Sequence, residues 1–209
     1  MLTPHTPLAL LATALLLPAC AKQVPAPSKP DPAPMARIQP APATGPADPA
    51  PSTTLNVGDP APALSVESWL RGQPVPSFQP GTVYVIEFWA TWCPPCVANI
   101  PHLNDLQAKH PECVIIGVAA SERQPPAGSG RPDTRLETLN NFLSKRDQSG
   151  QPINYRMAYD EDRSMSRDWM TPAGRNTIPT AFIVGKDARI AWIGHPSEMD
   201  PQLQTALHK

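Results

Sequence analysis

Two cysteines three residues apart are the residues best suited to do chemistry in this chain. Cys93 and Cys96 enclose Pro94 and Pro95, after a β-branched and aromatic run at 83–89 and before residues with helical periodicity. Cysteines at this spacing across the first turn of a helix are close enough to form a disulfide. The partial positive charge of a helix N-terminus favours a thiolate at the first of them. We therefore predict that Cys93 is the attacking thiolate and Cys96 the resolving thiol.

Two alternatives remain open for this pair, a purely structural disulfide and half of a zinc site. A zinc site needs a second Cys or His pair, and the sequence offers only Cys113, inside an apolar run, and isolated histidines. We expect no metal, and dithiol chemistry itself requires no cofactor. The prolines between the cysteines stiffen the loop and suit the first turn of a helix, where a missing N–H costs nothing.

The elements around the pair alternate between strands and helices. This alternation predicts an α/β fold with a central sheet that contains parallel strands and is covered on both faces. The expected strands are 83–89, 113–119, 180–184 and 189–193, and the expected helices are 95–109, one around 136–143, a short one at 162–170, and 200–208. The Pro- and Gly-containing stretch 121–134 is expected to be a loop.

The run from Phe88 to Cys96, Phe-Trp-Ala-Thr-Trp-Cys-Pro-Pro-Cys, resembles the active-site segment of thioredoxin-fold thiol-disulfide oxidoreductases, in the TlpA/ResA-like branch. The resemblance extends from about Gly58 to the C-terminus. It implies a thioredoxin-like fold, with a central mixed β-sheet and helices on both faces, and thiol-disulfide exchange as the activity. Trp92, Pro94 and Pro95 are then supporting residues of the site.

Further positions match the same family. Ile178-Pro179 resembles its cis-proline element, which pairs with substrate backbone, and Gly194 resembles its late-strand glycine beside the substrate groove. Glu87 stands where thioredoxin has a buried acid. An acid in so apolar a strand should have a raised pKa and could shuttle the proton of Cys96. The alternative for Glu87 is a core carboxylate without a catalytic role.

Departures from related families narrow the expectation. Peroxiredoxins place Thr and Pro ahead of the peroxidatic Cys, and the corresponding positions here hold Ala90 and Ile86, so peroxidase activity is disfavoured. The heme-maturation branch often carries Glu shortly after the second Cys. Residues 97–99 are Val-Ala-Asn, so the sequence does not support apocytochrome c as a specific substrate.

The N-terminal quarter of the chain differs in composition from the rest. Of the 30 prolines in 209 residues, half lie in the first 62 positions, and residues 8–17 form an uncharged apolar run of signal-peptide length. The following Leu17-Pro18-Ala19-Cys20 resembles the lipobox of bacterial lipoproteins, which implies a signal peptide at 1–19 and lipid on Cys20. The alternative is an ordinary cleaved signal peptide. Both imply export, to the periplasmic side of a bacterial membrane.

Residues 20–56 are Pro- and Ala-rich and lack aromatic residues, so we expect a disordered tether ahead of a thioredoxin-like domain at 57–209. The net charge is −1 and the basic residues are scattered, which argues against a nucleic-acid partner. Expected partners are exported proteins that carry disulfides or thiols, and the membrane through the lipid on Cys20.

The direction of the redox reaction has one indicator. Ile178 before Pro179 resembles the reducing thioredoxins, so reduction of partner disulfides is favoured, and a reductase needs a membrane redox donor. The alternatives are a thiol oxidase of the same fold and a non-catalytic peptide-binding module. Cys113 is expected to be a buried inert thiol and His195 a surface or capping residue. The loop 121–134 either helps to set partner choice or is a simple insertion.

Overall fold

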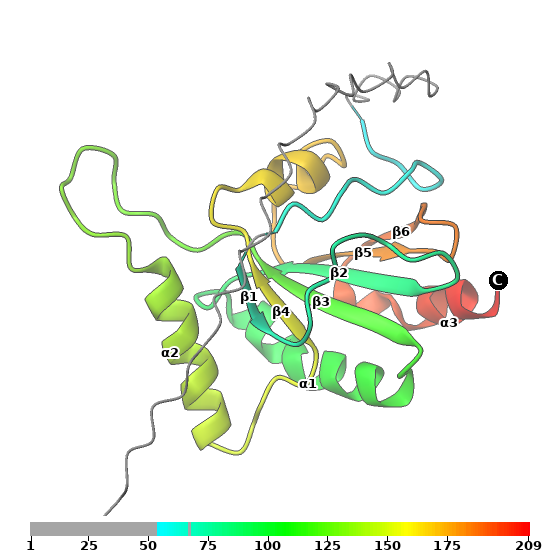
Figure 1. Cartoon of the computed structure of the whole chain (residues 1–209), viewed down its shortest axis with the longest axis horizontal. Coiled ribbons are helices and arrows are strands. Elements are labelled where there is room, and N and C mark those ends of the chain that lie inside the picture. The colour runs from blue at the N-terminus through cyan, green and yellow to red at the C-terminus, as the bar shows by residue number, and fades with distance from the viewer. Residues whose placement is uncertain (1–53, 67) are drawn as a thin grey trace, which may run out of the picture. The chain divides into compact units, whose positions relative to one another are not determined.

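The computed structural model describes residues 54–66 and 68–209, which form a six-stranded mixed sheet with the strand order β1-β4-β3-β2-β5-β6 (Figure 1). The predicted signal peptide, Cys20 and nearly all of the predicted tether lie outside the described residues. The strands are β1 (Ser68–Arg71), β2 (Val83–Trp89), β3 (Cys113–Ala119), β4 (Arg156–Tyr159), β5 (Thr180–Val184) and β6 (Ile190–Gly194).

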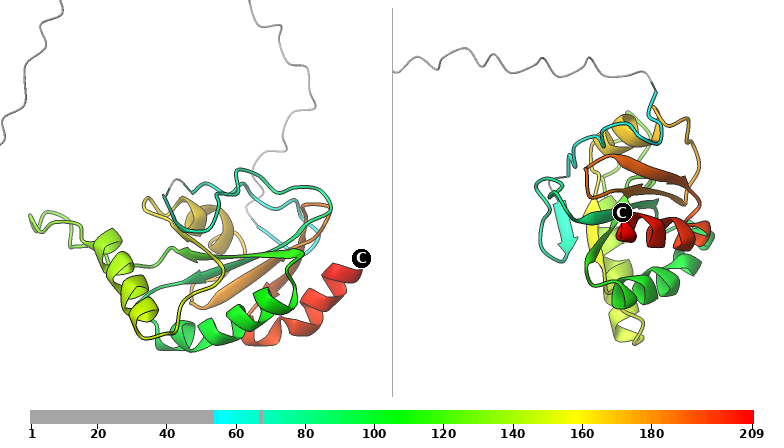
Figure 2. Two further views of the ribbon diagram at one scale, coloured as in Figure 1. Left: turned by 60° about the horizontal axis from the view of Figure 1, so that its bottom comes forward. Right: turned by 90° about the vertical axis from the view of Figure 1, so that its right-hand side faces the viewer.

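Helices cover both faces of this sheet, as predicted. On one face pack the three α-helices, which are α1 (Pro94–Lys109), α2 (Arg135–Gln148) and α3 (Asp200–His208) (Figure 2). The other face is covered by a five-residue π-helix, η1 (Ser166–Met170), and by the segment that precedes β2. A short 3₁₀ turn, η2 (Pro196–Glu198), leads into α3. No helix among the described residues is long and apolar enough to cross a membrane.

Strand β2 lies in the middle of the sheet, and all seven of its residues are buried. It runs parallel to β3 and antiparallel to β5. Val83, Val85 and Trp89 face the α-helices, whereas Tyr84 and Ile86 pack in the core on the side of η1. This two-sided burial explains the unbroken apolar run. The central strand β2 ends at Trp89, and Cys93 follows four residues later, at the start of α1.

Two strands were not predicted, and one predicted helix is much shorter than expected. Strands β1 and β4 have four residues each, too few to show a period, and they pair with each other in antiparallel fashion.

Only Ser166–Met170 of the predicted helix 162–170 is helical, and these residues form a π-helix. The carboxylate of Asp160 accepts hydrogen bonds from the N–H groups of Met165 and Ser166, and Trp169 Nε1 donates to the Ala63 carbonyl.

Candidate active site

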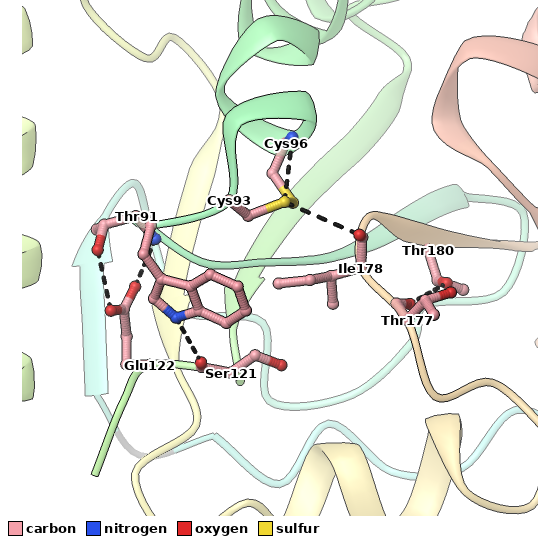
Figure 3. The surroundings of a disulfide bond; sticks show 9 residues. Thr91, Cys93, Cys96, Ser121, Glu122, Thr177, Ile178 and Thr180 are labelled. Atoms are coloured by element: carbon pink, nitrogen blue, oxygen red, sulfur yellow. Dashed lines mark hydrogen bonds between the residues drawn. A yellow bond between two sulfur atoms is a disulfide. The ribbon is translucent and has the colours of Figure 1, made fainter. Parts of the chain in front are cut away.

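The Cys93–Cys96 pair forms a disulfide at the N-terminus of α1, with the two Cα atoms 5.3 Å apart (Figure 3). Cys93 is the N-cap residue, and its Sγ accepts a hydrogen bond from the Cys96 N–H at 3.3 Å. Pro94 and Pro95 occupy the first two helical positions and have no N–H, so the first amide that α1 can offer belongs to Cys96. That amide and the helix dipole both stabilise negative charge on the Cys93 sulfur once the disulfide is reduced.

The cis-proline turn, which precedes β5, faces the disulfide at the C-terminal end of β2. The Ile178–Pro179 peptide bond is cis, as the resemblance implied, and the Ile178 carbonyl oxygen lies 3.8 Å from Cys93 Sγ. A hydrogen bond from Thr180 Oγ1 to the Thr177 carbonyl at 2.8 Å closes the turn. In the disulfide the Cys93 sulfur carries no hydrogen, so Cys93 Sγ and the Ile178 oxygen are in contact but form no hydrogen bond. In the reduced state the Cys93 thiol could donate to the same carbonyl.

Trp92 forms the exposed side of the site. Its side chain is 42% exposed although the two cysteines are almost fully buried. Its Nε1 donates to the Ser121 carbonyl at 2.9 Å, and the Arg123 guanidinium lies over the ring, 4.8 Å from the ring centroid. The segment after β3 therefore fixes the indole beside the disulfide.

Glu122 is a residue of this site that sequence reasoning missed. It is buried, and its two carboxylate oxygens accept hydrogen bonds from the backbone N–H of Thr91 at 2.6 Å and from Thr91 Oγ1 at 2.9 Å. Arg163 donates to the Glu122 carbonyl. The only signal in the sequence was an acid three residues beyond a buried strand, and nothing local pairs it with Thr91. Figure 3 shows these two hydrogen bonds between Glu122 and Thr91 beside the cysteine loop.

Glu87 is buried in β2, on the face of the sheet that α1 covers. Burial raises the pKa of this carboxyl from 4.5 to about 8, and Oε1 has no hydrogen-bond partner among the residues that the structure describes. Its neighbour in β3 is Gly117, where an added Cβ would lie 2.8 Å from Sδ of Met157 and 3.1 Å from Cε2 of Tyr155. The side chains of Met157 and Tyr155 thus fill the space beside Gly117. The direction predicted for the pKa of Glu87, upward, agrees with its burial in the structure.

Of the remaining predicted residues, Gly194 and His195 lie at the end of β6 and Cys113 lies at the start of β3. Gly194 ends β6 opposite Ala181 of β5, and the Trp192 ring lies against it so closely that a Cβ would clash. His195 caps η2, because its Nδ1 accepts from the Ser197 N–H. Cys113 is a free, buried thiol at the opposite end of β3 from the site, and burial raises its pKa to about 12. A thiol with so high a pKa is a poor nucleophile.

With this geometry established, comparison with known proteins identifies the family. Residues 57–193 match the AhpC/TSA family. The chain belongs to that family. FixW of Rhizobium leguminosarum is 33% identical over 148 residues, which cover 68% of this chain and 62% of FixW. The thiol-disulfide oxidoreductase ResA of Bacillus cereus (strain ATCC 10987) is 25% identical over 126 residues, covering 59% of this chain and 61% of ResA. The chain thus spans less than two thirds of the length of these relatives.

Solved structures confirm the fold. A thiol-disulfide isomerase from Corynebacterium glutamicum matches with a TM-score of 0.54 and 20% sequence identity, over 71% of this chain and 97% of that one. The fold is thioredoxin-like, with a mixed sheet and helices on both faces, as the resemblance implied.

The raised pKa of Glu87 predicts how stability depends on pH. In the unfolded chain this carboxyl ionises near pH 4.5, whereas the folded protein keeps its proton up to about pH 8. Between these values the folded state binds more protons, so the contribution of Glu87 to the free energy of unfolding falls as pH rises. The contribution is constant below pH 4.5 and above pH 8. We expect Glu87→Gln to remove this dependence of the free energy of unfolding on pH. At pH 8 the substitution should stabilise the oxidised protein by about 4 kcal/mol.

Urea unfolding of the oxidised protein at pH values from 5 to 9 measures this effect. Glu137→Gln, at an exposed acid in the first turn of α2, is the matched control and should keep the slope of the unmodified protein. Equal slopes for Glu87→Gln and the unmodified chain would show that the carboxyl ionises normally in the folded state.

Proposed function

We propose that this protein is an exported, membrane-tethered thiol-disulfide oxidoreductase that reduces disulfides of partner proteins. One observation carries the proposal: a disulfide-bonded cysteine pair at a helix N-terminus, facing a cis-proline turn. The similarity to ResA, which is named for this activity, supports it. Peroxide reduction is not part of the proposal, because Ala90 and Ile86 occupy the positions where peroxidatic sites carry Thr and Pro.

The reaction transfers two electrons from the dithiol to a partner disulfide. The Cys93 thiolate attacks one partner sulfur, the partner S–S bond breaks, and the other partner sulfur leaves as a thiolate that takes up a proton. Cys96 then loses its proton and attacks the Cys93 sulfur of the mixed disulfide. The second partner thiol is released, and the Cys93–Cys96 disulfide remains.

Glu87 is proposed to accept the Cys96 proton in its ionised form, which is populated mainly at and above about pH 8. Cys96 is buried, so its proton cannot pass directly to bulk water. A carboxyl with a pKa of about 8 titrates much nearer to the ordinary pKa of a thiol, roughly 8.5, than a carboxyl with a pKa of 4.5 does, so its carboxylate is the better proton acceptor for a thiol. The backbone of Ile178, together with Pro179 and Gly194, is proposed to hold the partner chain next to Cys93.

The cysteine variants test the exchange mechanism. We expect Cys93→Ser to abolish turnover of a disulfide-containing substrate, because the nucleophile is lost. Cys96→Ser should instead accumulate a mixed disulfide with the substrate, since the resolving thiol is missing. Non-reducing gel analysis and mass spectrometry detect this species. Cys113→Ser is the control and should turn over normally. Normal turnover in both Cys93→Ser and Cys96→Ser would refute the mechanism.

The direction of the reaction is tested by the reduction potential of the Cys93–Cys96 pair, measured by equilibration with thiol buffers and mass analysis. A reductase should have a potential near or below about −250 mV. A value near about −120 mV would instead make the protein an oxidase. In an oxidising compartment a reductase needs a membrane redox donor to restore its dithiol, and such a donor is part of the proposal.

Tethering is proposed to occur through lipid on Cys20. Several acyl chains, at about 0.8 kcal/mol for each buried CH₂ group, give stable attachment without a membrane-spanning helix. In a bacterial host that processes lipoproteins, we expect the unmodified chain to incorporate a labelled fatty acid and to sediment with membranes. Cys20→Ala should lose the label and appear in the soluble periplasmic fraction. Labelling that persists in Cys20→Ala would contradict the assignment of the anchor.

A further inference from the structure

Four segments either contain or contact the cysteine loop or adjoin a segment that does, and together they carry very little negative charge at the surface. They are the cysteine loop (90–95), the start of the segment after β3 (121–124), the cis-proline turn (175–179) and the end of β6 with the next two residues (194–196). Apart from the cysteines, their ionisable residues are Glu122, Arg123, Arg175 and His195.

The single acid in this set is directed inward. Glu122 is 4% exposed, and both of its carboxylate oxygens are occupied by the N–H and hydroxyl of Thr91. A partner chain that approaches the disulfide therefore does not meet this carboxylate. The surface of the four segments is left with positive charge.

The two arginines are exposed and are held by contacts in different segments. Arg123 lies over the exposed indole of Trp92, which is fixed by its own hydrogen bond to the Ser121 carbonyl. Arg175 begins the cis-proline turn, and its guanidinium donates to the Ile193 carbonyl of β6. Each guanidinium uses only part of its donor capacity in these contacts, so both can bind a carboxylate.

Exposed acids also lie beyond the four segments: Glu198 ends η2, two residues after Pro196, and two more acids lie on the turn after β4. Glu161 and Asp162 follow β4 and line a separate surface cavity with Ser65 and Tyr159. The carboxylate of Asp162 accepts from the Ser164 N–H. The same turn carries Arg163, which donates to the Glu122 carbonyl and adds a positive charge next to these acids in the chain.

We infer that the site prefers protein partners whose reacting disulfide is flanked by Asp or Glu residues. This inference rests on the proposed function and adds the chemical class of the substrate. Complementary charge raises the rate of productive encounter, and it does so most strongly at low ionic strength. Arg123 and Arg175 are the specificity-determining residues, with Trp92 as the platform for the first.

Three synthetic peptides of equal length test the inference. Each contains one disulfide, and the residues flanking it are Asp, Asn or Lys. The measurement is the second-order rate constant for reduction of each peptide by the reduced protein, at about 20 mM and about 200 mM salt. We expect the Asp peptide to react about 10-fold faster than the Lys peptide at low salt, with a smaller ratio at high salt because the charges are screened.

Variants locate the preference. In Arg123→Gln/Arg175→Gln the ratio of the Asp to the Asn rate constant should fall to near one, and in Arg123→Lys/Arg175→Lys it should be largely retained. Lys109→Gln removes a positive charge at the exposed far end of α1 and should leave the ratio unchanged. A fall in the ratio equal to that of the double Gln variant would assign the preference to net charge and overturn the inference.

The outcomes separate this inference from the proposed function. Equal rate constants for the three peptides in the unmodified protein would overturn the preference while leaving the oxidoreductase activity in place. If no peptide is reduced, the proposed function fails, and equilibrium binding of the same peptides to Cys93→Ser decides the inference. Tighter binding of the Asp peptide supports the preference, and equal binding refutes it.

Discussion

The chemistry of this site depends on a sulfur atom occupying the N-cap position of α1. A side chain at that position normally supplies an oxygen that accepts a backbone N–H, and here Cys93 Sγ accepts that of Cys96. Since Pro94 and Pro95 contribute no amide hydrogens, Cys96 supplies the first N–H of the helix to this sulfur. The same local geometry brings the two cysteines within disulfide distance and favours negative charge on the first when the bond is opened.

The strand order explains why distant segments meet at this helix start. Strand β2 delivers the cysteine loop, and its two neighbours in the sheet are β3 and β5. The segment after β3 clamps Thr91 through Glu122 and holds Trp92 through Ser121. The turn before β5 presents the Ile178 carbonyl to Cys93 from the other side. A site at the carboxyl end of the central strand is therefore supported by both adjacent strands.

Local sequence pattern was enough to predict the parts of this arrangement that are local in the chain. The β2 strand, the helix that follows it, and the roles of Pro94 and Pro95 as first-turn residues all follow from neighbouring residues. The family resemblance added the cis peptide at Pro179. Glu122 could not be found in this way, because its partner Thr91 is brought to it only by the pairing of β2 with β3. Strands β1 and β4 escaped detection because four residues cannot show a period.

The buried carboxyl of Glu87 lowers the stability of the folded protein when it is ionised. A charged acid at this depth is disfavoured by desolvation, and the structure offers Oε1 no partner among the described residues. The glycine beside it in β3 leaves room for the side chains of Met157 and Tyr155. An apolar residue or an amide at position 87 would avoid the cost of ionisation. The proton-relay role proposed above gives a reason for the acid that packing alone does not.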